Sequence, residues 1–277
     1  MSQFGNIVFI VWRESIEALL VVGILHAWLG QQDEAARRRG RMFLWSGVAA
    51  GLALAALLGA ALILFDDALD DDARQYFQSA LTLIAAALIV QMVLWMRRHG
   101  RTLARDIHAS LQQAAEGSNW WGVFLLAAIA VAREGSETVV FLAGSLSAAR
   151  GGGLGGAVLA IFSGLAIAVA TYGLLQLGGR VLSWRTFFRV TEVMLLLLAG
   201  ALLLTGVDGL VGLGVVPRLS GRLWDTSALL GDGGPVGGLV SSLTGYRARP
   251  DLTQIAVLGL YWAAIAWLLR PRAKGMA

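Results

Sequence analysis

Two short charged stretches inside long apolar runs are the residues best suited to chemistry. Both read Arg-Glu-x-x-Glu: Arg13, Glu14 and Glu17 form the first motif, and Arg133, Glu134 and Glu137 form the second. A single charge at the centre of a membrane-spanning helix costs about 2.5 to 3.5 kcal/mol on insertion scales, unless it is paired or faces water. Because the chain carries the same costly arrangement twice, we expect it to use the carboxylates.

Helical spacing predicts how each motif points. Positions i and i+3 or i+4 share one face of a helix, so Glu14 and Glu17 point the same way and Arg13 lies one turn before Glu17. If the two helices cross at their motifs, four carboxylates and two guanidiniums meet near the bilayer centre. Such a site attracts a cation, and the arginines hold the carboxylates while it is empty. Ser136 and its neighbours Ser15 and Thr138 add hydroxyl oxygens.

Carboxylate-rich oxygen ligation suits hard ions such as Fe(III), Mn(II), Mg(II) and Ca(II), and less exclusively Fe(II). The chain has no cysteine, and neither motif contains histidine, so a copper or zinc site built on those ligands is disfavoured. The structural alternative is a pair of buried salt bridges that join two helices. Two arginines cannot neutralise four glutamates, however, and an uncompensated buried carboxylate must take up a proton or bind something.

Composition predicts the surroundings of these motifs. Of 277 residues, 57% are hydrophobic and only 14% are charged, against about 25% charged in a typical soluble domain. The fold class is therefore all-α, a polytopic helical membrane protein. The net charge of +4 does not indicate nucleic acid, because the basic residues cluster between apolar segments as topology signals do. The N-terminus enters a membrane-length segment without a basic region, so no cleavable signal is expected.

Seven spans of roughly 20 residues, the length that a bilayer core requires, are predicted at residues 5–29, 43–65, 77–96, 121–145, 154–177, 187–206 and 252–269. The first, third and fifth loops and the tail hold fourteen basic residues, whereas the other side holds six in longer loops. The positive-inside rule then places the N-terminus outside and the C-terminus inside. The protein is expected in the cytoplasmic (inner) membrane, in contact with lipid.

The chain reads as one membrane domain, 1–277, with an internal repeat. Repeat 1 covers about 5–96 and repeat 2 about 121–206, and each begins with a motif-bearing span. These two spans run in opposite directions, so the halves are inverted, as in many transporters whose substrate site lies at the midplane. An external loop at 207–251 and a seventh helix at about 252–269 follow the repeat.

Several other acids are accessory candidates. An acidic external stretch could collect a cation or dock a basic partner, although charge runs are usually solvated faces; it contains Asp66, Asp67, Asp70, Asp71 and Asp72. Glu192 is either an inner ligand or, more simply, the salt-bridge partner of Arg189. Asp225 in the long external loop has the same two interpretations as the acidic stretch: it either helps to collect a cation or dock a partner, or it is simply solvated. Residues 97–119 could carry a short amphipathic helix.

The paired motif, in the first and fourth of seven spans, resembles the oxidase-dependent, high-affinity iron permease family of fungi and bacteria. The resemblance covers essentially the whole chain, including Trp224-Asp225-Thr226-Ser227 in the external loop. The family's commoner motif is Arg-Glu-Gly-x-Glu, which the second copy matches through Gly135, whereas the first copy has Ser15.

The resemblance implies a permease, not an enzyme, that imports iron across the cytoplasmic membrane. Its substrate would be Fe(III) or Fe(II), with Glu14, Glu17, Glu134 and Glu137 as ligands and no permanently bound cofactor. It also implies an external or periplasmic protein that oxidises or delivers the iron.

Other functions stay open from the residues alone. Transport of another hard cation such as Mn(II), or of a small polyamine, would use the same carboxylates. A membrane redox subunit is less consistent with the sequence, because haem-binding subunits need pairs of histidines on facing helices. The chain has three histidines, with one of them, His26, at the end of a predicted span.

Overall fold

The computed structural model describes residues 2–99, 120–148, 154–176, 184–232 and 234–270. Within these ranges it is all-helical, and the single β-bridge pairs Arg222 with Asp251. Eight helices are present in the described residues: α1 Ser2–Gly30, α2 Glu34–Ala68, α3 Asp71–His99, α5 Trp121–Ala148, α6 Leu154–Gln176, α7 Trp184–Gly212, α8 Pro235–Thr244 and α9 Leu252–Leu268. The expected amphipathic helix at 97–119 falls mostly outside these ranges.

The long helices coincide with the predicted spans, but several extend beyond them. Helix α2 begins at Glu34 instead of residue 43 and has 35 residues, which gives a length of roughly 50 Å at 1.5 Å per residue. Helix α7 continues to Gly212 instead of residue 206. Hydropathy marks only the part of a helix that lies in hydrocarbon, about 30 Å thick, so polar helix ends such as the arginine-rich start of α2 were assigned to loops.

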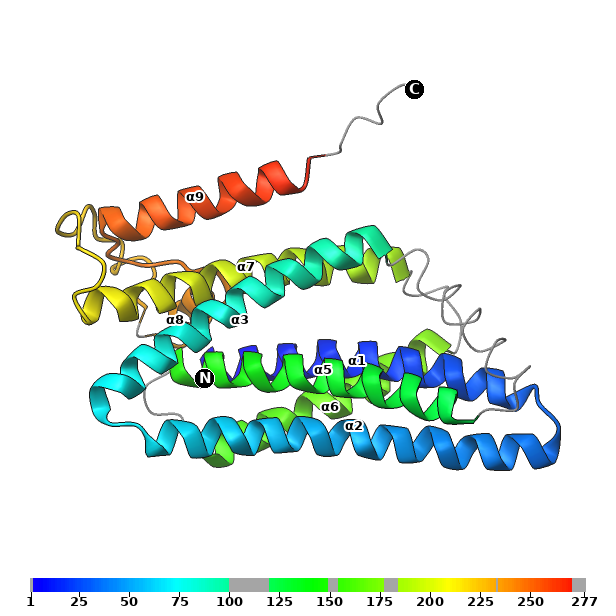
Figure 1. The fold of residues 1–277 in the computed structure, drawn as a ribbon. Helices are drawn as coiled ribbons and strands as arrows, with labels where there is room; N and C mark the ends of the chain where they lie inside the picture. Colours follow the sequence, from blue (N-terminus) through cyan, green and yellow to red (C-terminus); the bar gives the residue numbers. More distant parts are fainter. Residues whose placement is uncertain (1, 100–119, 149–153, 177–183, 233, 271–277) are drawn as a thin grey trace, which may run out of the picture.

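The helices lie lengthwise beside one another (Figure 1). Helix α2 packs along α5, α1 along α6, and α3 along α7, while α5 also contacts α1 and α3. The largest buried cluster joins five helices, with Phe9 from α1, Ile89 from α3, Phe141 from α5, Leu198 from α7 and Ile265 from α9 among its members. The two motif-bearing helices, α1 and α5, are therefore central.

Glycines let two of these helix pairs approach closely. A Cβ atom built on Gly47 of α2 would lie 2.5 Å from the carbonyl oxygen of Phe124 in α5, and one on Gly164 of α6 would lie 2.8 Å from the carbonyl oxygen of Val8 in α1. Small residues at helix contacts are typical of membrane bundles. They bring α2 against α5 and α6 against α1, which fixes the two motif helices from outside.

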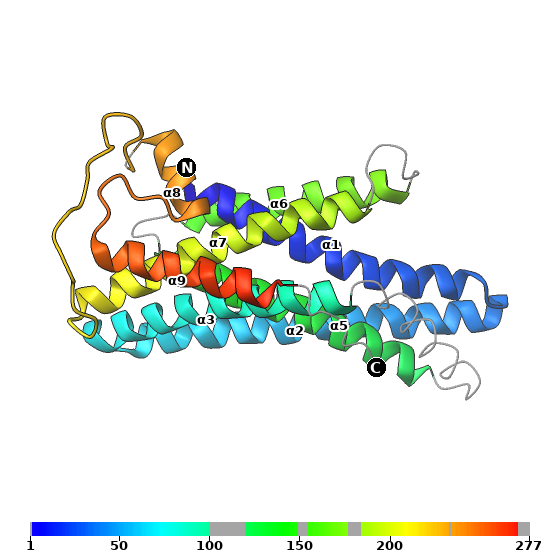
Figure 2. The ribbon, with the colours of Figure 1, turned by 90° about the horizontal axis from the view of Figure 1, so that it is seen from above.

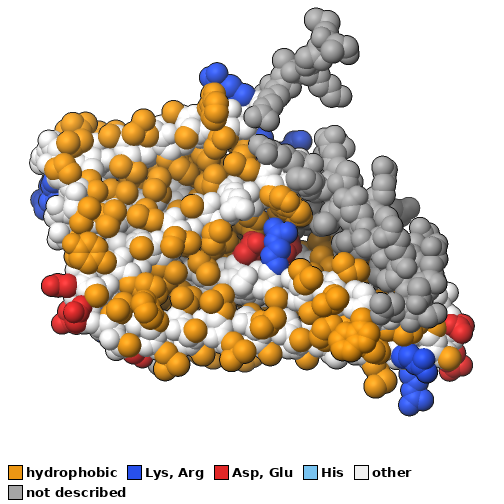
Figure 3. Space-filling view, in the orientation of Figure 1, with side chains coloured by type: hydrophobic (Ala, Val, Ile, Leu, Met, Phe, Trp, Pro, Cys, Tyr) orange, Lys and Arg blue, Asp and Glu red, His pale blue; other side chains and the backbone are white. Residues whose placement is uncertain are grey.

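Four described helices are long and apolar enough to cross a membrane by length and composition; these are α2, α3, α6 and α7. Helices α1 and α5 have 29 and 28 residues, and each carries the three charges of a motif in its middle. Helix α9 is apolar but has only 17 residues. The space-filling view shows a side of the molecule covered mainly by hydrophobic side chains, with a small charged group near its middle (Figure 3).

The segment predicted as a long external loop, 207–251, is partly helical. Helix α8 begins with Pro235 in its first turn and ends at Gly245, which has a φ of 74°. Proline just inside the start and glycine just past the end of a helix are the usual boundary signals. Here the helix between them is short and other glycines surround it, so these signals do not stand out in the sequence. Helix α8 packs against α1 and α7 and lies next to the N-terminal end of α1 (Figure 2).

Candidate functional site: a carboxylate cluster between two helices

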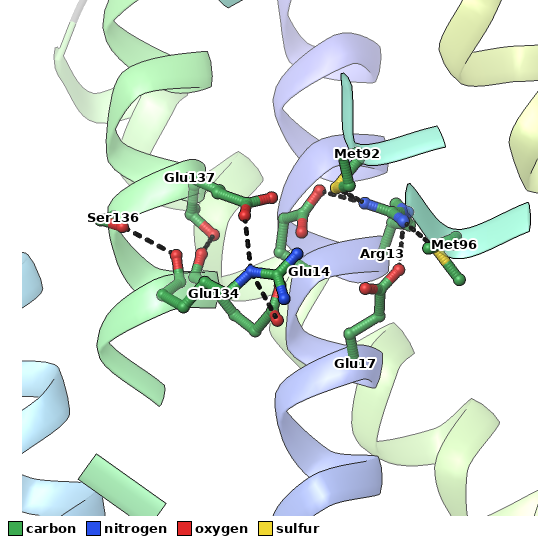
Figure 4. Close-up of polar contacts among 10 residues, drawn as sticks. Arg13, Glu14, Glu17, Met92, Met96, Glu134, Ser136 and Glu137 are labelled. Carbon is green, nitrogen blue, oxygen red and sulfur yellow. Dashed lines mark hydrogen bonds and ion pairs between the residues drawn. The ribbon is translucent and has the colours of Figure 1, made fainter. Parts of the chain in front are cut away.

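The two motifs face one another where α1 and α5 pack together (Figure 4). One carboxylate oxygen from each of Glu14, Glu17 and Glu134 lies within 4.8 Å of the other two. An ion bound to oxygen at about 2.1 Å holds its ligands at most about 4.2 Å apart, so small side-chain rotations would bring these three onto one ion. The cluster joins side chains that are more than 110 residues apart in the chain.

The fourth motif glutamate, Glu137, lies beside this group. Its carboxylate accepts a hydrogen bond from Arg133 Nε at 3.0 Å. Two neighbouring hydroxyls donate to their own helix: Ser136 Oγ to the Arg133 carbonyl at 2.8 Å, and Thr138 Oγ1 to the Glu134 carbonyl at 2.7 Å. The oxygen of Ser136 keeps lone pairs, but its proton is engaged with the backbone. We therefore regard this serine as a support for the α5 motif.

Arg13 is enclosed by the site. Its side chain is 2% exposed, and Nη1 lies 2.8 Å from Oε1 of Glu14, which is 1% exposed. The guanidinium also forms an ion pair with Glu17 at i+4. A buried charge without a partner would be strongly destabilising, so each of these groups depends on the others being ionised.

Arg133 has the same place in its motif but different surroundings. Its side chain is 38% exposed, and its guanidinium carbon lies 4.4 Å from the centre of the Trp95 ring. A guanidinium over the face of a tryptophan gains cation–π attraction. The two motifs are thus alike in sequence and unlike in burial, with the first arginine locked and the second partly open.

Helix α3 provides side chains that the sequence did not indicate as part of the site. Besides Trp95, the thioether sulfurs of Met92 and Met96 accept hydrogen bonds from the Arg13 guanidinium. These three residues share a helix face through i+3 and i+4 spacing. The sequence contains this spacing, but apolar residues at helical spacing are mostly core residues. The spacing therefore does not indicate that these side chains contact the motif arginines.

The carboxylates retain free bonding capacity. Among the described residues, Oε2 of Glu14, Glu134 and Glu137 is buried and has no hydrogen-bond partner. Buried polar atoms are nearly always paired, and four carboxylates outnumber two guanidiniums by two. Unpaired carboxylate oxygens on both motif helices, with an excess of negative charge, are the donors that a hard or intermediate cation needs.

The acidic stretch is a tight turn between helices instead of an open loop. Asp66 and Asp67 belong to the end of α2, and Asp71 and Asp72 form the first turn of α3. Asp70 accepts a hydrogen bond from the Ala73 backbone N–H at 2.8 Å, as a helix-capping aspartate does. Acids in a first turn also suit the helix dipole.

The first acid of this stretch is also engaged. Asp66 accepts from the Gln78 side chain at 3.1 Å and has Arg74 Nε 3.6 Å away. Asp67 lies 3.9 Å from the same arginine. Helix capping and local pairing thus engage Asp66, Asp67 and Asp70, although Asp67 and Asp70 stay exposed, as do Asp71 and Asp72, and these four remain available to a cation or partner.

Glu192 does not pair as predicted. The structure joins it to Arg97 of α3 instead of Arg189, one turn away on its own helix. Arg189 is exposed, whereas Glu192 faces α3, along which α7 packs. Sequence spacing identifies only partners on the same helix, so a cross-helix pair could not be seen. The pair ties α3 to α7 close to Met96.

Asp225 is held within the segment that connects α7 to α8. Its carboxylate accepts from the Ser227 backbone N–H at 2.9 Å and lies 2.9 Å from Arg249 Nε. Hydrogen bonds from the side chain and backbone of Ser227, together with Arg249, lower the pKa of Asp225 to about 2. This aspartate therefore fixes the fold of the segment, and it lies outside the carboxylate cluster between α1 and α5.

Comparison with known proteins identifies the family of this chain. The family model described as "Iron permease FTR1 family" matches residues 5–271. The chain is 28% identical over 274 residues to a protein named ferrous iron permease EfeU from Escherichia coli O6:H1, which covers 97% of this chain and 96% of that one.

A protein of the same name from Shigella sonnei shows the same identity and coverage. One from Yersinia pestis is 24% identical over 270 residues, covering 95% of this chain and 93% of the other. No solved structure matches the chain. Because the family model extends over nearly the whole sequence, including both motifs, this chain is a membrane protein that belongs to the iron permease FTR1 family.

Proposed function

We propose that this protein imports iron across the cytoplasmic membrane, and that the glutamates of the two motifs bind the ion on its way. The observation that carries the proposal is the cluster of Glu14, Glu17 and Glu134, whose oxygens lie within 4.8 Å of one another between two central helices. Membership of an iron permease family supports iron as the substrate. Glu137, one turn away beside Arg133, serves as the fourth ligand when the ion moves.

The carried species is Fe(II). The relatives are named ferrous iron permeases, and carboxylate oxygens accept Fe(II) as well as Fe(III). An external protein delivers the iron or sets its oxidation state before uptake. The exposed acids of the acidic turn would first meet it; these are Asp67, Asp70, Asp71 and Asp72. The permease itself holds no permanent cofactor.

Seven spans, with the N-terminus outside and two inverted halves, give the proposed transport cycle. Exchange of the halves maps α1 onto α5 and α2 onto α6, and one pair of contacts supports this exchange, because α1 packs along α6 as α5 packs along α2. Helix α3 packs along α7, its own counterpart. Rocking of one half against the other would open the carboxylate cluster first to the outside and then to the inside.

Uptake of radioactive iron in cells tests this proposal. Glu134→Gln keeps the shape of the side chain and removes its charge, so we expect uptake to fall at least tenfold while the protein remains inserted. Glu192→Gln is the matched control, because Glu192 is a glutamate of the same bundle that pairs with Arg97 outside the cluster. Normal iron uptake by the Glu134→Gln variant would overturn the assignment of the site.

The same assay identifies the substrate. Fe(II) and Fe(III) are offered separately, with Mn(II) as a competitor in each case. Preferred uptake of Fe(II) that excess Mn(II) does not suppress supports ferrous iron. If Mn(II) competes equally with Fe(II), the substrate is a broader class of divalent cations and not iron specifically.

A further inference from the structure

The guanidinium of Arg13 is surrounded by a set of atoms that is unusual for a salt bridge. Nη1 lies 2.8 Å from Oε1 of Glu14 and also donates to the sulfur of Met92. Nη2 pairs with Glu17 and donates to the sulfur of Met96. Each terminal nitrogen of this cation therefore joins one carboxylate oxygen to one thioether sulfur, as Figure 4 shows.

Thioether sulfur is a weak hydrogen-bond acceptor, so two of them are a poor choice for holding a buried guanidinium. Sulfur is, however, a soft ligand that binds metal ions of soft or intermediate character. Two carboxylates and two thioethers around one buried positive charge are the donor set of a mixed oxygen and sulfur metal site. Oε2 of Glu14 is also buried here and has no hydrogen-bond partner, which leaves a further donor free.

We propose that Met92 and Met96 are iron ligands, and that the place filled by the Arg13 guanidinium is an ion position where Fe(II) exchanges with that guanidinium. Glu14 and Glu17 hold the ion from α1, and the two sulfurs hold it from α3. The inference rests on the proposed import of iron through the motifs. It adds α3 as a third helix to the ligand set and gives the first motif a role that differs from that of the second.

Selectivity is the consequence of this ligand set. Oxygen ligands alone do not distinguish Fe(II) from Mn(II) or Fe(III), which are harder ions. Thioether donors favour Fe(II) over both, because softness of the ligand must match that of the metal. The second motif offers an aromatic ring at the corresponding place, where Trp95 lies under Arg133, so selection by sulfur would occur only on the α1 side.

Iron K-edge X-ray absorption of the purified protein, loaded anaerobically with Fe(II), tests the ligands directly. The chain has no cysteine, so any sulfur bound to the iron comes from methionine. We expect a sulfur shell in the wild type that is lost in the Met92→Leu/Met96→Leu variant. Leucine nearly conserves the volume of methionine and is usually tolerated in packed cores. Met194→Leu is the matched control, because Met194 on α7 is partly buried against the main core.

The outcomes separate this inference from the proposed function. Iron bound with oxygen ligands only in the wild type would overturn the role of the sulfurs and leave iron binding at the glutamates intact. Failure of the wild type to bind Fe(II) would overturn both. A sulfur shell that survives in the double variant would also contradict the inference, because the sulfur would then come from another methionine.

Transport selectivity is the second readout. In the Met92→Leu/Met96→Leu variant we expect Mn(II) to inhibit Fe(II) uptake at a concentration about tenfold lower than in the wild type. If the methionines only hold Arg13, uptake falls while the Mn(II) concentration for half-inhibition stays unchanged, and the inference is then wrong. The Met194→Leu control should match the wild type in both quantities.

Discussion

At the scale of single residues, the two copies of the motif differ in how deeply their arginines are buried and in which residues surround them. Arg13 is enclosed between two glutamates and two methionines, whereas Arg133 is 38% exposed and rests on Trp95. Identical spacing fixes which atoms can meet along one helix, but the neighbouring helix decides how deeply they are buried. The first arginine is therefore the main counter-charge of the empty site.

This difference predicts unequal effects of removing the two arginines. Arg13→Ala leaves Glu14 and Glu17 buried without a counter-charge, and breaking a buried pair in this way costs about 3 to 5 kcal/mol. Arg133→Ala removes a partly exposed partner, for which about 1 kcal/mol or less is expected. Thermal unfolding of the iron-free protein in detergent measures both losses.

A triple variant provides the control for this comparison. Combining Arg13→Ala with Glu14→Gln and Glu17→Gln should recover most of the lost stability, since neutral amides need no counter-charge. Equal destabilisation by the two single arginine substitutions, or no recovery in the triple variant, would show that Arg13 is not the counter-charge of these carboxylates.

At the scale of helices, glycines determine how α2 approaches α5. A Cβ on Gly47 would meet the Phe124 carbonyl oxygen at 2.5 Å and the Ala127 Cβ at 3.0 Å. Backbone cannot move aside as a flexible side chain can, so Gly47→Ala must push the two helices apart. We expect a net loss of about 1 to 2 kcal/mol, because overpacking costs about 1 to 3 kcal/mol and alanine recovers part of it through helix propensity.

Gly59 on the same helix is the matched position for this test. A Cβ there would lie 3.7 Å from the methyl groups of Val139, which is ordinary contact. Gly59→Ala should therefore be neutral or stabilising by up to about 1 kcal/mol. The shift of the thermal midpoint in detergent should thus differ in sign between the two variants. A stable Gly47→Ala protein would mean that α2 and α5 pack less closely than in this structure.

Sequence alone predicts the long helices and the face on which each motif presents its charges, because both depend on local signals. Apolar runs of membrane length and charges at i, i+3 and i+4 are local signals. The contacts of Met92, Met96 and Trp95 with the arginines depend on where α3 crosses α1 and α5, which no local spacing encodes. The partner of Glu192 was missed for the same reason, since Arg97 lies on another helix.

Helix ends were predicted less well than helix centres. Asp70 and its neighbours read as an acidic loop, yet they cap and begin α3. Helix α8 was hidden in a glycine-rich segment, although Pro235 and Gly245 mark its ends. Capping residues are polar, like the residues of loops, so composition does not separate the two.

At the scale of the whole molecule, part of the packing pattern fits two related halves. The exchange of α1 with α5 and of α2 with α6 maps the contact of α1 with α6 onto that of α5 with α2 and leaves α3 packed on α7. Among the described residues, however, the extensive contact of α3 with α5 has no counterpart of similar size between α7 and α1. Helices α8 and α9 lie outside this pattern, and α8 covers the N-terminal end of α1. An axis in the membrane plane would make the halves inverted, a relation found in many transporters that work by alternating access.

The predicted topology makes this relation testable, and the absence of cysteine in the chain makes the test clean. Gln31→Cys marks the turn between α1 and α2, and Ala68→Cys marks the turn between α2 and α3; both positions are exposed. With the N-terminus outside, a membrane-impermeant maleimide should label Ala68→Cys in intact spheroplasts, and Gln31→Cys only after permeabilisation. Leu229→Cys, at a residue that is 88% exposed in the segment before α8, should be labelled under the same conditions as Ala68→Cys.

The reverse labelling pattern would place the acidic turn inside, and iron would then meet the motifs from the opposite end of the bundle. Labelling of all three positions from one side would contradict the membrane crossing by α2 that separates Gln31 from Ala68, and with it the topology on which the inverted repeat depends.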